Sequence, residues 1–150
     1  MRSRGPSLLV VAALLGSGCG GDTTRAPSGS GSLRAWTEQA RKVCAADAPP
    51  LDKAQSAGKA ARTDREVHAA EQQFADAVAA YSRDLAAIPH PPDPRIASYL
   101  SGWHGLARDS QAVHDAGIAG KRALALRAAK RMSARLPALQ KLETELSACP

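Results

Sequence analysis

Residues 63–88 read TDREVHAAEQQFADAVAAYSRDLAAI, and this stretch decides the fold class. It opens with Thr63 and carries Glu66 three residues later, which is the capping-box pattern of a helix start. Its large apolar side chains then recur every seven residues, at Val67, Phe74, Tyr81 and Ile88. A narrow apolar seam of this period is typical of helices that pack in bundles. The stretch therefore predicts a helix with one buried face.

The rest of residues 33–150 indicates more helices of the same kind. No stretch alternates apolar and polar residues with β-branched side chains, as strands do. Ser32, and Asp93 followed by Pro94, mark two further helix starts. Four main helices are predicted, over residues 33–48, 64–88, 94–119 and 121–148, and Pro137 is expected to kink the last one without ending it.

Residues 1–18 have the three parts of a secretory signal peptide. Two arginines form the basic start, residues 8–15 (LLVVAALL) form the apolar middle, and residues 16–18 supply small side chains. The apolar run is far shorter than the roughly 20 residues that span a bilayer as a helix. The sequence therefore predicts export of the chain rather than a retained transmembrane anchor.

The run Leu14-Leu15-Gly16-Ser17-Gly18-Cys19 resembles the lipobox of bacterial lipoproteins. Ser17, Gly18 and Cys19 match the family pattern, and Gly16 stands where leucine is usual. The resemblance implies a diacylglycerol thioether on Cys19, which becomes the first residue of the mature chain. Two acyl chains hold a protein durably, so the expected location is the cell membrane, lipid-anchored on the extracytoplasmic side. Cleavage near Gly18 with secretion into the medium is the alternative.

The remainder of the chain then divides into a linker and one domain. Residues 19–32 carry the lipidated cysteine followed by Gly, Ser, Thr and Pro, the composition of a flexible linker. Residues 33–150 form the bundle domain. The chain has a formal net charge of +6, of which residues 1–18 contribute only two arginines. A basic surface in the envelope is compatible with an envelope protein or an anionic wall polymer as partner. The five aromatic residues do not interleave with the basic ones, which excludes a nucleic-acid surface.

Two cysteines remain once Cys19 is assigned to the lipid. Cys44 and Cys149 are expected to form a disulfide, because exported thiols usually pair. Two free buried thiols are the alternative. Such a bond closes a loop of about one hundred residues and contributes roughly 4–5 kcal/mol in the chain-entropy model.

The disulfide also constrains the predicted topology. Cys44 lies near the end of the helix predicted over 33–48, and Cys149 follows the last helix. In a plain four-helix up-and-down bundle these ends lie roughly 30 Å apart, whereas a disulfide needs Cα atoms within about 7 Å. We therefore predict a short additional helix at about 51–62 that makes a fifth pass. The predicted fold is an all-α, disulfide-closed antiparallel helical bundle with four main helices plus this short one.

No catalytic or cofactor-binding motif stands out in the sequence. CxxCH, Gly-x-Ser-x-Gly and a glycine-rich phosphate loop are absent. His68 and Glu71 share a helix face but supply only two of the four ligands that a structural zinc site needs. His104, beside Trp103, is expected to pack at the boundary of the core. We therefore predict no enzymatic activity, no cofactor and no metal.

Two other patterns bear on binding. Trp36, Tyr81 and Trp103 fall on apolar helix faces and form a candidate ligand pocket if they do not simply fill the core. Arg127, Arg131 and Arg135 repeat every four residues along one helix face. That face is either a solvated outer surface or a surface for an anionic membrane or polymer.

The domain has a Trp and a Cys in its first helix, a Pro-Pro pair in mid-chain and a Cys-Pro ending. In these features it resembles small two-cysteine all-helical exported proteins of actinobacteria, a resemblance that implies no known activity. The predicted function is that of an envelope-anchored non-catalytic lipoprotein, a module that binds a protein or the cell wall. An extracytoplasmic helical bundle that binds a small ligand is the alternative.

Overall fold

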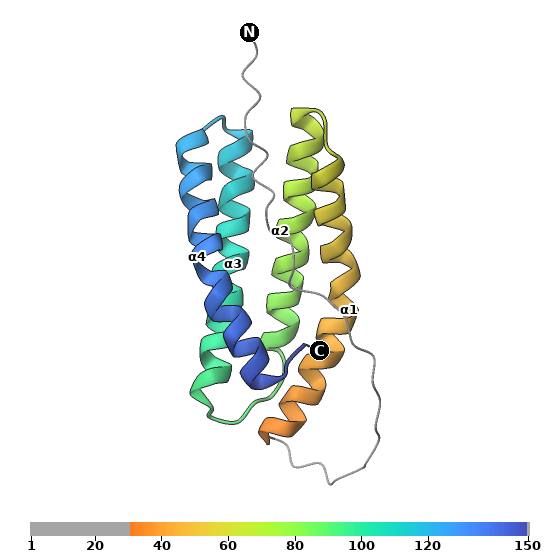
Figure 1. Ribbon diagram of the computed structural model, residues 1–150, viewed down its shortest axis with the longest axis vertical. Helices are drawn as coiled ribbons and strands as arrows, with labels where there is room; N and C mark the ends of the chain where they lie inside the picture. Colours follow the sequence, from red (N-terminus) through yellow and green to blue (C-terminus); the bar gives the residue numbers. More distant parts are fainter. Residues whose placement is uncertain (1–30, 150) are drawn as a thin grey trace.

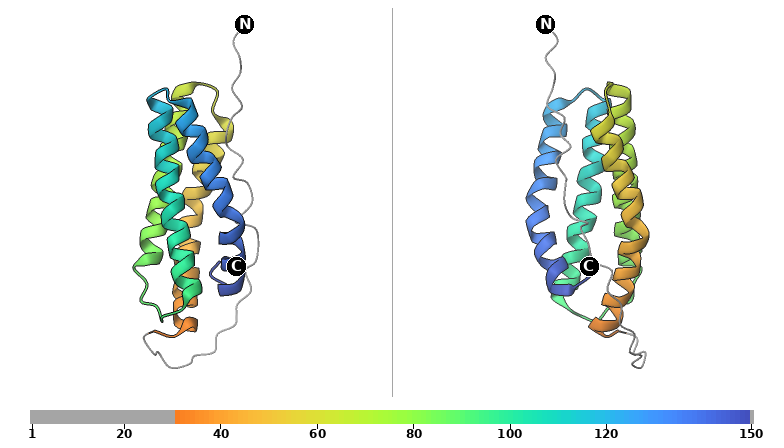
Figure 2. Two further views of the ribbon diagram at one scale, coloured as in Figure 1. Left: turned by 90° about the vertical axis from the view of Figure 1, so that its left-hand side faces the viewer. Right: turned by 45° about the vertical axis from the view of Figure 1, so that its right-hand side comes forward.

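The computed structural model describes residues 31–149, which form four antiparallel helices (Figure 1). The helices are α1 Leu33–Ala60, α2 Asp64–Ala86, α3 Pro94–Ile118 and α4 Arg122–Leu146. Each helix packs along its neighbours in the chain, so the four stand side by side in every view (Figure 2). The predicted all-α, disulfide-closed bundle is confirmed. The signal peptide, Cys19 and nearly all of the linker lie outside the described residues.

The helix starts follow the local sequence signals. Ser32, Thr63 and Asp93 each occupy an N-cap position, and each side chain accepts a hydrogen bond from a backbone N–H of the first turn. At α2, Glu66 completes the capping box by accepting from the Thr63 N–H at 2.9 Å. These bonds satisfy donors that a helix start leaves without an intrahelical partner.

α1 continues through Pro49 and Pro50 to Ala60, so the separate short helix predicted at about 51–62 is not formed. A proline inside a helix removes one backbone hydrogen bond and costs about 3 kcal/mol. Both prolines are exposed, so the carbonyl groups left without donors can bind water. Burial of one continuous face offsets the cost, since the same side of α1 is buried before and after the prolines: Trp36, Ala40, Cys44, Leu51, Ala54 and Gly58.

The continuous α1 removes the need for a fifth pass along the bundle. Because α1 has 28 residues, Cys44 lies in its first half, toward the pole where α4 ends (Figure 1). The Cys44–Cys149 disulfide forms there with a Cα–Cα distance of 5.8 Å. The prediction of five passes was wrong because it ended the first helix at the prolines.

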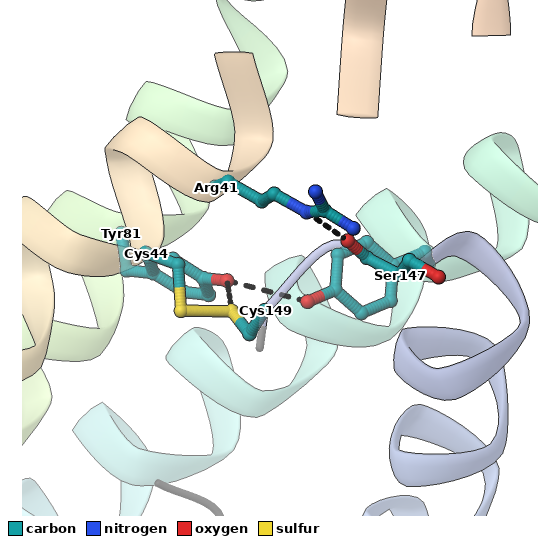
Figure 3. Close-up of a disulfide and its surroundings, with 6 residues drawn as sticks. Arg41, Cys44, Tyr81, Ser147 and Cys149 are labelled. Atoms are coloured by element: carbon teal, nitrogen blue, oxygen red, sulfur yellow. Dashed lines mark hydrogen bonds between the residues drawn. A yellow bond between two sulfur atoms is a disulfide. The ribbon is translucent and has the colours of Figure 1, made fainter. Parts of the chain in front are cut away.

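Two hydrogen bonds join the first turns of α1 to the C-terminal end of α4. Thr37 Oγ1 donates to the Leu146 carbonyl oxygen at 3.1 Å. Arg41 Nε donates to the Ser147 carbonyl oxygen at 2.9 Å (Figure 3). These donors satisfy carbonyl groups that the end of α4 leaves unpaired. We call the disulfide and these two bonds together the C-terminal clamp.

A buried carboxylate joins α3 to α4. Asp109 is 1% exposed and accepts hydrogen bonds from Arg131 Nε at 2.7 Å and Arg135 Nε at 3.0 Å. Burial alone would raise the pKa of Asp109, but hydrogen bonds from both arginines and their charges outweigh it and lower that pKa. Gly105 makes room for this contact, since a Cβ atom there would lie 2.6 Å from the Arg135 guanidinium carbon.

The core lies between the four helices. The largest fully buried side chains are Trp36, Tyr99, Leu85, Ile96, Leu106 and Val78. Within residues 31–149, no helix combines the length and the apolar character that crossing a bilayer requires.

Replacing Cys44 and Cys149 together by alanine is expected to lower the free energy of unfolding by about 4 kcal/mol. The disulfide spans 105 residues, so its loss returns much conformational freedom to the unfolded chain. Urea denaturation of the purified protein measures the change. Wild-type protein in a thiol-free reductant is the matched comparison, and an unchanged midpoint in both samples would contradict the expectation.

The Asp109→Asn variant is expected to lose about 2–3 kcal/mol of stability at pH 7, because it removes the charge that both arginines face. Arg131→Gln, at a side chain that is 52% exposed, is expected to lose less than about 1 kcal/mol. Since the pKa of Asp109 is lowered, its contribution is present above the ordinary carboxyl pKa and disappears as the pH falls through the folded value. Denaturation of the three proteins at pH 7 and pH 3 tests this, and a deficit in Asp109→Asn that persists undiminished at pH 3 would count against it.

Candidate functional site

A small pocket opens beside the disulfide, between α1 and α4. These two helices lack the extensive contact that each makes with its neighbour in the chain. Side chains from all four helices reach into this space, among them Leu51, Phe74, Tyr81, Trp103, Leu136 and Glu143. The pocket that remains has a volume of about 40 Å³.

Two of the three predicted pocket residues lie at this site. Tyr81 and Trp103 line the pocket, and their rings meet edge to face with centroids 4.5 Å apart. Trp36 is fully buried, does not line the pocket, and packs edge-on against Tyr99 at 6.1 Å. Tyr99 in turn contacts Trp103 at 6.2 Å. The structure therefore joins the three predicted residues through Tyr99, which the sequence analysis did not single out.

The Tyr81 hydroxyl connects this aromatic cluster to the disulfide. Its oxygen lies 3.2 Å from Cys149 Sγ and 3.2 Å from the Tyr99 hydroxyl (Figure 3). Because a disulfide sulfur carries no hydrogen, Tyr81 is the donor to Cys149 and Tyr99 is the donor to Tyr81. Burial raises the pKa of both hydroxyls, and the pKa of Tyr99 reaches about 12. Both groups therefore act as hydrogen-bond donors and not as bases near neutral pH.

Glu143 is the titratable group of the pocket. Burial raises its pKa from 4.5 to about 7, so its charge changes near neutral pH. Its carboxylate and the sulfur atoms of Cys44 and Cys149 lie within 4.8 Å of one another. Metal binding needs deprotonated thiolates, and these sulfurs are bonded to each other. The oxidised site therefore offers a metal a single carboxylate.

Two histidines that the sequence analysis considered, His68 and His104, lie outside the pocket. His68 Nδ1 lies 3.1 Å from the Glu71 carboxylate, and within residues 31–149 no third ligand group joins this pair. His104 is exposed, so the expectation that it packs at the core boundary was wrong. Its neighbour Trp103 takes the buried position on that turn of α3.

The basic stripe on α4 is shorter than the sequence indicates. Arg131 and Arg135 are paired with Asp109, which leaves Arg127 as the member of the three that does not pair with this carboxylate. The sequence signal for this contact is Gly102 and Gly105, two glycines inside a helix, which mark a close approach of another element. At Gly102 that element is again α4, whose Leu139 side chain would lie 2.6 Å from an added Cβ.

Comparison of the chain with protein-family models, with curated proteins and with solved structures gives no match. A pocket of about 40 Å³ has room for one to three water molecules, whereas pockets for small organic ligands occupy roughly 300–1,000 Å³. What the arrangement offers chemically is one carboxyl group that titrates near pH 7, two buried hydroxyl donors and an oxidised disulfide.

The Glu143→Gln variant is expected to be more stable than wild type at pH 8 and to show a weaker dependence of stability on pH. The folded protein keeps the Glu143 proton up to about pH 7, whereas the carboxyl group ordinarily releases it near 4.5. The free energy of unfolding of the wild type therefore falls as the pH rises between these values. Above them, the whole destabilisation caused by the ionised Glu143 is present. Asp47, whose pKa is raised by burial and then by Asp84, contributes with the same sign and remains in the variant.

Thermal denaturation at pH 5, 6, 7 and 8 measures this effect. The matched control is Glu145→Gln, which removes an exposed carboxylate from the same turn of α4. Equal pH slopes for wild type and Glu143→Gln, or an equal change in the control, would show that Glu143 does not carry the effect.

Proposed function

We propose that this protein is an envelope-anchored, non-catalytic lipoprotein whose helical domain binds another protein or a wall polymer. The lipobox-like run ending at Cys19 supports the anchor and its extracytoplasmic location. The disulfide supports the same location, because such bonds persist mainly in oxidising compartments. The membrane is then one partner, reached through the lipid, and the bundle supplies the second.

The observation that carries the binding role is the filled interior of the bundle. The pocket beside the disulfide is about 40 Å³ and is lined mainly by apolar side chains. The buried carboxylate of Asp109 is neutralised by Arg131 and Arg135. Because the interior offers so little room, the outer surface is the part of the domain on which recognition can act.

The alternative is a bundle that encloses a small ligand. Tyr81 and Trp103 do line the disulfide pocket, as that alternative expects. The volume of this pocket, about 40 Å³, is nevertheless well below the several hundred cubic ångströms that a small organic ligand needs. The geometry therefore favours the interaction module.

The Cys19→Ala variant tests the anchor. Wild-type protein is expected to sediment with membranes and to incorporate labelled palmitate, and processing is expected to stop in the presence of globomycin. Cys19→Ala is expected to lose the label and the membrane association, because the thioether has no sulfur on which to form. The double variant Cys44→Ala, Cys149→Ala is the control and keeps the label. Native protein found in the cytosol with residues 1–18 intact would refute the proposal.

A further inference from the structure

A groove runs along the outer side of α2 and α3. Its volume is about 800 Å³, against about 40 Å³ for the disulfide pocket. It lies beside the core face, since its α2 lining residues at positions 79, 82, 83 and 86 alternate with the core residues Val78, Tyr81 and Leu85. The two helices stand side by side along its length (Figure 1).

Small side chains keep the groove open. Ala79 and Ala86 on α2 and Ala107 on α3 line its floor with short side chains, and Leu100 is the one long apolar side chain among the lining residues. Ser82 also lines the groove and is only 8% exposed. Its hydroxyl makes no hydrogen bond with any residue between 31 and 149. The floor therefore combines apolar surface with one serine hydroxyl that makes no hydrogen bond within the described residues.

The charges around the groove have one sign. Arg83 and Arg108 line it, and no carboxylate does. Arg83 and Arg108 form no ion pair within the described part of the chain. The buried carboxylate of α3, Asp109, is directed to the two arginines of α4, and Asp84 of α2 acts on Asp47 of α1. The cations of the groove are therefore left without counter-charges.

We infer that this groove is the docking site for an acidic amphipathic helix of a partner protein. The lining residues of α3 run from position 100 to 111, which corresponds to roughly 17 Å or three helical turns. A third helix fits the furrow between two packed helices. Its apolar side chains would cover the floor, and its Asp and Glu residues would face Arg83 and Arg108. A wall polymer matches the charge but not the apolar floor.

This inference rests on the proposed function, which makes the domain an interaction module. Its test is photo-crosslinking in the cells that produce the full-length protein. p-Benzoylphenylalanine replaces Ala86, which is exposed and lines the groove. The matched controls carry it at Ala45 on α1 and Ala138 on α4, two exposed alanines outside the groove. The expected result is a discrete protein adduct from position 86 alone, whose crosslinked peptide is a predicted amphipathic helix rich in Asp and Glu.

Charge variants sharpen the test. In the Ala86 photo-crosslinking protein, Arg83→Glu with Arg108→Glu is expected to reduce the adduct on the order of ten-fold, since two attractive contacts become repulsive. Arg83→Lys with Arg108→Lys keeps the charges and is expected to retain most of it. Arg122→Glu with Arg127→Glu makes the same reversal at two exposed positions on α4 and is expected to leave the adduct unchanged. Thermal denaturation verifies that all three pairs of substitutions keep the fold.

The outcomes separate the two proposals. Adducts from Ala45 or Ala138 but not from Ala86 would overturn the groove and leave the interaction module standing. An adduct from Ala86 to glycan or lipid, or to a neutral or basic peptide, would also overturn the acidic helix. The absence of a protein, glycan or lipid adduct from all three positions would count against the interaction module itself.

Discussion

The covalent and hydrogen-bonded link between the first and last helices is the constraint on which the rest of the structure depends. The other helix pairs that pack extensively are neighbours in the chain and are held by long apolar faces, whereas α1 and α4 lack such a contact. The C-terminal clamp replaces it at one pole with a disulfide and two side-chain hydrogen bonds. The Tyr81 hydroxyl then docks the aromatic cluster onto Cys149. The clamp thus fixes both the closure of the bundle and the small size of the pocket beside it.

A second constraint acts between α3 and α4 and determines the partners of two cations of α4. Gly105 lets α4 approach α3, and the buried Asp109 draws Arg131 and Arg135 inward. Two of the cations that the sequence places on an outer stripe are therefore structural. The cations along α2 and α3 that lack such partners, Arg83 and Arg108, gather at a groove.

The sequence predicted most of the fold because its signals there are local. Thr63 with Glu66, and Asp93 with Pro94, act within one helical turn, and the structure confirms both starts. The end of the first helix was misplaced because the two prolines were given more weight than the helical spacing of the apolar residues on either side of them. Leu51 follows Cys44 by seven residues, so the buried face continues across Pro49 and Pro50 in register.

The candidate site was harder to predict because it depends on contacts between distant helices. Tyr81 and Trp103 were found because aromatic side chains on an apolar face are visible in the sequence. Glu143 was missed because a carboxylate beside the leucine stripe of α4 looks solvated until the disulfide and Tyr81 are placed next to it. Asp109 was missed for the same reason, since its partners lie 22 and 26 residues away.

The position of the groove has a consequence for an anchored protein. α1 begins, α2 ends and α4 ends at the same pole of the bundle (Figure 1). The groove follows the last two turns of α2, and so it lies in the half of the bundle that contains this pole. With the proposed lipid on Cys19, the chain from Cys19 to Leu33 can reach at most about 50 Å. On the proposed anchor, that reach would keep the groove close to the membrane, so the acidic helix inferred for it is best sought in segments of other proteins that lie next to the bilayer.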